Sequence, residues 1–340
     1  MPRITYNEMK QVFSDLLVAN NFTNNNAMTC AEVFATNSLE GVYSHGVNRF
    51  LKFVDDVQHQ YINPAAKPVL KHVAGALEQW DGQLGPGMLN AILATNRATT
   101  LANENGIGCI AMANTNHWMR GGYYAWLAAK QNCIFIAWTN TIANMPAWGA
   151  TDTRLGNNPF VMSIPFNDSA IVLDMAMSQY AHGKLQVYAN KNQMLEVPGG
   201  YDSQGNLSVD PKEILASDRK LPAGYWKGAG MSLLLDILAM VLSGGKSVAQ
   251  ISESKIEYAI SQVFIAIDLT KLENYPSINN AILEVIKDYL ASTSEKENNP
   301  VQYPGENVLR TKKENLQNGI PVDDVVWNSI LTLHKKITNP

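Results

Sequence analysis

Apolar side chains recur at helical spacing through the first seventy residues. A first stripe consists of Met9, Val12, Phe13, Leu16 and Leu17. A second consists of Ala27, Cys30, Ala31, Phe34 and Ala35, with Gly41 as a plausible stop. A third helix is predicted over residues 44–57, with inward positions at Phe50, Phe53, Val54 and Val57. The pattern predicts a helical N-terminal unit.

The pattern changes after the turn-rich stretch 82–87. A helix is predicted over 88–103, and helical segments recur at 123–130, 231–242, 278–290 and in the last thirty residues. Short β-type runs lie between them, at 108–113, 133–139, 160–164, 171–175 and 263–267. Strands mixed with helices and long loops favour the α+β class over a regular βαβ series. We expect residues 1–74 and 308–340 to form a helical domain and 75–307 an α/β domain.

The composition narrows the class of protein. With 46% hydrophobic and 16% charged residues among 340, the chain can bury a large core. A net charge of −4 without a basic block argues against a nucleic-acid partner. The polar N-terminus, and an apolar stretch at 231–242 too short to span a bilayer, predict a cytoplasmic protein without membrane attachment. Three scattered cysteines predict neither disulfides nor structural zinc.

Two apparent nucleotide motifs fail their context test. Gly106, Gly108 and Ala111 match GxGxxA, but a helical pattern precedes them and a strand pattern follows, the reverse of a Rossmann loop. Gly245-Lys246-Ser247 resembles the end of a P-loop, but Met240 occupies the position that requires glycine. A dinucleotide, if bound, therefore needs another kind of fold.

The segment Ser44 to Arg49 (SHGVNR) is the strongest chemical candidate. His45 and Arg49 are four residues apart, so on a helix they would share a face. Imidazole exchanges a proton near neutral pH, and guanidinium grips a carboxylate with two hydrogen bonds. A 2-oxo acid needs both groups when hydride reaches its carbonyl carbon. A solvated His/Arg helix face is the alternative, and the residues alone leave it open.

Other clusters follow at junctions between predicted elements. His117 and Arg120 lie in a loop between a strand and a helix, where a capped helix start with a buried histidine is the alternative. Asp174 ends an apolar strand. A helix cap and a polar group directed at a functional site are the two interpretations of this position. Trp226 and Lys227 lie between two glycines, where an aromatic turn with a solvated lysine is the alternative. No His, Asp or Glu set has metal-ligand spacing.

Together these segments resemble the malate/L-lactate dehydrogenase family, also called sulfolactate dehydrogenase-like. SHGVNR, NHWMRGGYY, MPAWGA with LGNNP, VLDMAMS, GYWKG and YPGE occur in this order, from about residue 3 to the C-terminal helix. The resemblance implies a non-Rossmann mixed or antiparallel sheet plus a helical domain. It also implies a homodimer that uses NADH, or alternatively NADPH, to reduce a small 2-oxo acid, and the motifs are most similar to those of members acting on a keto sugar acid. Another 2-oxo or 2-imino acid, or a non-catalytic binding role, remains open.

The resemblance also assigns residues. His45 is the implied proton donor, and the implied substrate-binding residues are Ser44, Arg49, His117 and Arg120. The implied cofactor-binding residues are Ala170, Ile171, Val172, Leu173, Asp174, Met175, Ala176, Trp226, Lys227, Gly305, Glu306 and Asn307. Two departures from the family pattern lie on the expected cofactor side, Asn157 in place of threonine and Asn307 in place of histidine. No metal is implied.

Overall fold

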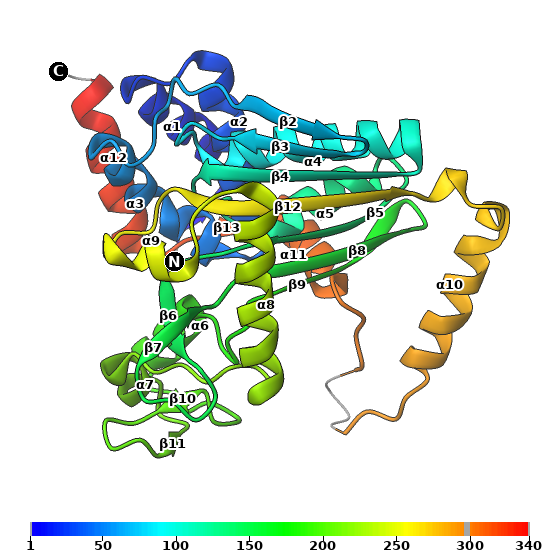
Figure 1. The fold of residues 1–340 in the computed structure, drawn as a ribbon. Helices are drawn as coiled ribbons and strands as arrows, with labels where there is room; N and C mark the ends of the chain where they lie inside the picture. The colour runs from blue at the N-terminus through cyan, green and yellow to red at the C-terminus, as the bar shows by residue number, and fades with distance from the viewer. Residues whose placement is uncertain (1, 296–299, 339–340) are drawn as a thin grey trace.

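A seven-stranded sheet forms the centre of the computed structural model, which describes residues 2–295 and 300–338 (Figure 1). The strand order is β2-β3-β4-β12-β5-β8-β9. The bounds are β2 Val69–Ala74, β3 Leu77–Asp81, β4 Ile107–Thr115, β5 Cys133–Thr139, β8 Phe160–Phe166, β9 Ser169–Met175 and β12 Ile260–Asp268. Strands β3 and β4 run parallel, and the other neighbours in this sheet are antiparallel. The predicted α+β class is confirmed, since a βαβ series would give parallel neighbours.

Helices cover both faces of the sheet. On one face lie α4 (Gly87–Asn105) and α5 (Gly121–Ala129), which pack on Ile110 and Phe264. On the other lies α8 (Trp226–Ser243), which packs on Ala111 and Val263. Adjacent residues of a strand point to opposite faces of the sheet. Where helices cover both faces, the residues that point to either face must be apolar. This explains why β4, β5 and β12 have the continuous apolar runs from which they were predicted.

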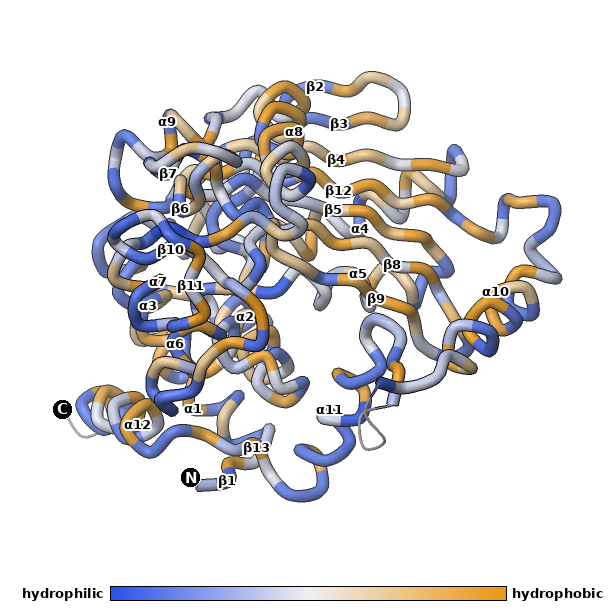
Figure 2. The backbone as a smooth tube through the Cα atoms, turned by 90° about the horizontal axis from the view of Figure 1, so that it is seen from below, coloured by the Kyte–Doolittle hydropathy of each residue, from blue (hydrophilic) through white to orange (hydrophobic). Residues whose placement is uncertain are grey.

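Helix α8 is long and apolar enough to cross a membrane by length and composition, but only 33% of it is buried. Its inner side packs on the sheet, where the Trp138 indole donates to the Leu235 carbonyl at 3.1 Å. Asp236, in the middle of the helix, accepts from Asn140 and from the Val248 backbone. The outer side exposes Leu234, Leu238 and other apolar residues, and Figure 2 shows its hydrophobic colour beside β2 and β3. The packing is that of a sheet-covering helix with an uncovered apolar face.

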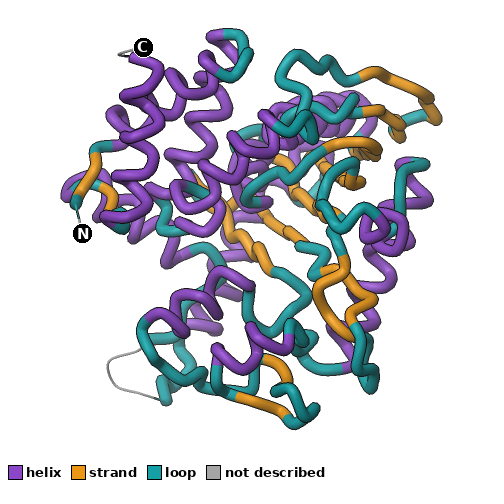
Figure 3. The backbone as a smooth tube through the Cα atoms, turned by 90° about the vertical axis from the view of Figure 1, so that its left-hand side faces the viewer, coloured by secondary structure: helices purple, strands orange, loops and turns teal. Residues whose placement is uncertain are grey.

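The two ends of the chain meet in a helical bundle, visible beside both termini in Figure 3. It contains α1 (Tyr6–Ala19), α2 (Asn24–Leu39), α3 (Val47–Gln58) and α12 (Asp324–Thr338). Phe13 stacks on Phe50 with ring centroids 4.0 Å apart, and Trp327 of α12 contacts Phe13 edge-on. The short strands β1 (Arg3–Ile4) and β13 (Ile320–Pro321) pair beside them. The predicted domain boundary at residue 75 stays a prediction. Strand β2 lies within residues 1–74, which were assigned to the helical domain, but it belongs to the central sheet.

A third group of elements has no counterpart in the sequence prediction. It contains the hairpin β6 (Ala143–Pro146) and β7 (Thr153–Gly156), followed by α6 (His182–Asn190), β10 (Gly200–Tyr201), β11 (Leu207–Ser208) and α7 (Pro211–Ser217). We call the part from 178 to 224 the small lobe; Leu185 and Ile214 are buried in its own core. The remaining elements are η1 (Tyr43–His45), α9 (Val248–Glu253), η2 (Leu269–Lys271), α10 (Tyr275–Leu290) and α11 (Glu306–Asn318). Helix α10 projects away from the sheet in Figure 1.

The GxGxxA segment lies between α4 and β4, as its context predicted. A side chain at Gly108 would place its Cβ 2.2 Å from the Ala98 carbonyl oxygen. The glycine therefore serves the close packing of α4 on β4.

Candidate active site

His45 and Arg49 do not share one continuous α-helix, which corrects the prediction for 44–57. Ser44 and His45 belong to the 3-10 turn η1, and α3 begins at Val47. Gly46 interrupts the helix with φ −114° and ψ −125°. The reason is the close contact with α2, where the Ser38 hydroxyl accepts from the Val47 backbone at 2.8 Å. A Cβ on Gly46 would lie 2.2 Å from that hydroxyl oxygen, so this glycine permits the contact.

His45 is held by a second imidazole and a hydroxyl at its ring and by an amide at its backbone. Its ring stacks on that of His117 with centroids 5.6 Å apart, and its Nδ1 lies 3.0 Å from the Ser44 hydroxyl. The Asn37 amide donates to the His45 carbonyl at 2.9 Å. Burial lowers the pKa of His45 to about 4, and the positive charges of Arg49 and Arg120 add to this effect. His45 is therefore neutral at physiological pH.

His117 is fixed in a defined tautomer. Its Nδ1 accepts from the Met119 backbone at 3.0 Å, so Nε2 carries the proton of the neutral ring. Burial lowers its pKa well below the usual value, with further contributions from Arg49 and His45. The site thus contains two stacked neutral imidazoles. Among the described residues, the Nε2–H of His117 donates to no other group.

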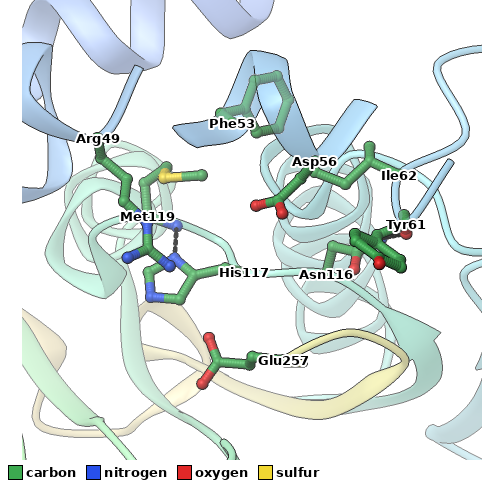
Figure 4. A pocket seen from close by; sticks show the side chains of 9 residues that line it. All are labelled: Arg49, Phe53, Asp56, Tyr61, Ile62, Asn116, His117, Met119 and Glu257. Carbon is green, nitrogen blue, oxygen red and sulfur yellow. Dashed lines mark hydrogen bonds between the residues drawn. The ribbon is translucent and has the colours of Figure 1, made fainter. Parts of the chain in front are cut away.

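Arg49 lines a small pocket together with His117 (Figure 4). Within residues 2–295 and 300–338, its guanidinium makes no hydrogen bond or ion pair. Its charge nevertheless lowers the pKa of His45, His117 and His182, and it also favours the ionised form of Glu257. A guanidinium that is not paired in this way, among neutral imidazoles, is suited to bind an anion, above all a carboxylate.

Two residues of this neighbourhood were missed in the sequence. His182 begins α6 in the small lobe, and the adjacent Gly183 is so close to Ser44 that a Cβ there would lie 2.8 Å from the Ser44 Cβ. Burial lowers the pKa of His182, with the charges of Lys220 and Arg49 acting in the same direction. Glu257 precedes β12 and lines the Arg49 pocket. Neither residue stands in a local motif, so only the fold brings them to the site.

Arg120 differs from Arg49 in being fully engaged by the protein. Its guanidinium pairs with Glu40 at the end of α2, lies 3.5 Å from the Asp174 carboxylate and stacks over Trp126. Lys312 of α11 pairs with the same Glu40 at 2.9 Å. Burial raises the pKa of Asp174, and the charge of Arg120 opposes this. The substrate-binding role of Arg120 stays a prediction, whereas its ion pairs join helices to the sheet.

The predicted cofactor residues gather along β9. Residues 170–175 lie in this edge strand and Ala176 follows it, while Glu306 and Asn307 open α11. The Val172 backbone donates to the Pro304 carbonyl at 3.0 Å. Gly305 adopts φ +94°, and a Cβ on it would lie 3.2 Å from the Val172 nitrogen. The fold thus brings segments more than 100 residues apart in the sequence into contact, and their role in cofactor binding stays a prediction.

Trp226 and Lys227 open α8 on the surface, and the preceding loop is tied to the segment after β9 by Ala223 N–H donating to the Met177 carbonyl at 2.8 Å. Neither the Trp226 ring nor the Lys227 ammonium has a ring or ion-pair partner among the described residues. An exposed aromatic face and a free cation beside a glycine-lined backbone suit a flat ring and a phosphate group. These residues therefore fit a dinucleotide, although their roles stay predictions.

Comparison with known proteins agrees with this geometry. The model of the malate/L-lactate dehydrogenase family matches residues 4–331. A curated 2,3-diketo-L-gulonate reductase from Escherichia coli O1:K1 is 44% identical over 333 residues, which cover 97% of this chain and 100% of that protein. The structure of sulfolactate dehydrogenase from Methanocaldococcus jannaschii matches with a TM-score of 0.89 at 26% identity, covering 99% of this chain and 98% of that one. Malate dehydrogenase from Entamoeba histolytica matches with a TM-score of 0.93 at 22% identity, covering 100% and 99%. The sulfolactate dehydrogenase-like fold implied by the motifs is confirmed.

Proposed function

The chain belongs to the malate/L-lactate dehydrogenase family of NAD(P)-dependent oxidoreductases, and we propose that it reduces 2,3-diketo-L-gulonate to 3-dehydro-L-gulonate with NADH. The observation that carries the proposal is the Arg49 guanidinium, which has no ion pair among the described residues and lies beside the stacked imidazoles of His45 and His117. The likeness to the Escherichia coli reductase over nearly the whole chain supports the choice of substrate. NADPH is the alternative reductant.

In the proposed reaction Arg49 binds the substrate carboxylate and thereby orients the neighbouring C2 carbonyl. Fixing a reactant in this way lowers a barrier by converting a bimolecular encounter into an intramolecular one. The nicotinamide, when bound, supplies the hydride to C2. His45 donates the proton to the C2 oxygen as negative charge develops there. Ser44, at 3.0 Å from His45 Nδ1, orients the donor ring, and His117 and Arg120 line the same side.

The low pKa of His45 is consistent with this role once substrate is included. Arg49 is one of the charges that lower the pKa of His45 to about 4. Burial is the largest cause of the low pKa, and the Arg49 charge is the second. A carboxylate bound to Arg49 offsets that charge, so the His45 pKa rises on binding. The proton donor is therefore charged most readily when a substrate is present.

The cofactor is proposed to lie along β9. Residues 170–176 would contact it through the strand, Gly305, Glu306 and Asn307 from the start of α11, and Trp226 and Lys227 from the start of α8. Trp226 offers a ring face, and Lys227 a cation for a phosphate.

We further propose a cytoplasmic homodimer in which a second copy covers α8. Leu234, Ile237, Leu238 and Val241 recur at helical spacing on its outer face, and each is more than 40% exposed. An apolar face of this kind, without a charged residue among these four, suits burial against another protein surface. Sedimentation of the wild type against Leu234→Asp would show a shift from dimer to monomer.

Arg49 and His45 would serve any 2-oxo or 2-imino acid, because they contact only its carboxylate and reacting group. Such an acid is the second candidate, and the match to sulfolactate dehydrogenase favours it. The test is NADH oxidation with 2,3-diketo-L-gulonate beside pyruvate, oxaloacetate and a blank. Turnover of pyruvate alone would support the proposed type of reaction and contradict the proposed substrate.

His45→Ala should lower kcat by roughly 10²- to 10⁴-fold with the fold intact, because a general acid contributes about that much. His59→Ala is the matched control, since His59 lies at the end of α3 with an exposed ring. An unchanged kcat in His45→Ala would exclude it as the proton donor.

A further inference from the structure

Glu257 directs a carboxylate into the Arg49 pocket without a counterion in contact. Figure 4 shows it beside His117, pointing into the space between the two. One oxygen, Oε2, accepts from the Ile142 backbone at 3.1 Å. The other, Oε1, accepts no hydrogen bond from any residue that the structure describes. Burial raises the pKa of Glu257, and Arg49 acts against this. The carboxylate thus has a free acceptor in a site of opposite charge.

In the part of the chain that the structure describes, no residue that lines the pocket donates to Oε1. The Asn116 amide, which lines it, already donates to the carbonyls of Tyr61, Leu84 and Gly85 at 2.8–3.1 Å. Arg49 and Glu257 face the same space, yet no ion pair within 4.0 Å joins them in the described part of the chain. The space between them has room for about one water-sized group. A group of that size with an O–H donor fits between them.

We propose that Glu257 binds a hydroxyl group of the substrate and so selects hydroxylated 2-oxo acids over simple ones. This rests on the proposed function for Arg49 as the carboxylate site. The ligand is then held at two points, its carboxylate by Arg49 and a hydroxyl by Glu257. A simple acid such as pyruvate has no hydroxyl to donate to the Glu257 oxygen and so forgoes this hydrogen bond, which favours the hydroxylated acid.

The test compares kcat/KM for 2,3-diketo-L-gulonate with kcat/KM for pyruvate in four proteins. Glu257→Ala should lower this ratio by roughly 10- to 150-fold, the equivalent of one hydrogen bond to a charged group. Glu257→Gln keeps an acceptor for Ile142 but loses the charge, so its ratio should fall between the wild type and Glu257→Ala. Glu253→Gln, an exposed carboxylate on α9, is the matched control and should keep the wild-type ratio. Equal losses on both substrates would show a structural role and overturn the proposal.

A second readout separates this proposal from the proposed function. L-Gulonate carries hydroxyls but no oxo group, and propionate carries neither. L-Gulonate should raise the Tm of the wild type more than that of Glu257→Ala, whereas propionate should raise both equally. If the wild type reduces pyruvate but not the diketo acid, the proposed substrate fails while the Tm comparison still decides the role of Glu257. Equal Tm shifts with L-gulonate would overturn that role whatever the assay shows.

Discussion

Arg49 and Arg120 both lower the pKa of His45, but their surroundings differ. Arg120 is 5% exposed and its charge is balanced by Glu40 and Asp174. Arg49 borders a pocket, and the described residues offer it no ion pair. A buried charge that is paired within its own protein stabilises the fold, whereas a charge in a pocket without an ion-pair partner is available to a ligand. The two side chains can therefore be separated by what their loss changes.

Arg120→Met should lower the free energy of unfolding by about 3–5 kcal/mol, because it leaves the buried Glu40 and the neighbouring Asp174 without their main counterion. Denaturant unfolding at neutral pH measures this. A loss below about 1 kcal/mol would remove the contrast with Arg49.

Arg49→Met should weaken substrate binding and leave stability unchanged. Truncating one partner of a buried charge pair costs about 2–5 kcal/mol, so KM for the oxo acid should rise by roughly 30- to 5,000-fold. The free energy of unfolding should not fall. Lys52→Met, one turn further along α3 and half exposed, is the control for loss of a cation. An unaltered KM for Arg49→Met would contradict the carboxylate site.

The pH dependence of stability should distinguish the pocket from the ion network. In the native state the pKa of His45 is about 4 and that of His117 is well below its usual value, whereas the unfolded chain takes up these protons near pH 6.5. The unfolded state therefore binds more protons between these values, and stability falls as pH is lowered from 6.5 to 4.

Arg49→Met should make that fall shallower, because removing the cation lets both pKa values rise toward those of the unfolded chain. Each unit regained reduces the loss by about 1.4 kcal/mol. Unfolding curves at several pH values measure the slope. Equal slopes in the two proteins would show that Arg49 does not control these rings.

Lys312→Met should have the smallest effect. Lys312 also pairs with Glu40, but its side chain is 40% exposed and solvent screens the pair. A loss of about 0.2–1 kcal/mol in the free energy of unfolding is expected. A loss as large as that of Arg120→Met would place the main counterion of Glu40 on α11.

The sequence predicted best those elements whose apolar pattern is produced by burial. Strand β5 was predicted with the observed bounds, and the stripes of α1 and α2 lie in the observed core. Strand β2 was missed because all six of its residues are exposed, so no alternation marks it. The small lobe was missed because its elements are short and its core is small.

The residues of the candidate site also differ in how visible they are in the sequence. His45, Arg49 and His117 stand in dense local segments of polar and glycine residues, which make them visible in the sequence. Glu257 and His182 reach the pocket from distant segments, and nothing within a few residues of either indicates chemistry. The start of α3 could not be predicted from periodicity, because it depends on the close contact of Gly46 with Ser38 on another helix.

The contact between Pro304 and Val172 has a consequence for solubility. Strand β9 ends the sheet, and an open edge of this kind offers unpaired backbone groups to any other extended chain. The Pro304 carbonyl occupies the Val172 N–H, and Gly305 keeps the returning segment close enough to cover that part of the edge. A bulky residue at position 305 would therefore expose the edge to association with other molecules, and aggregation would accompany any loss of nucleotide binding.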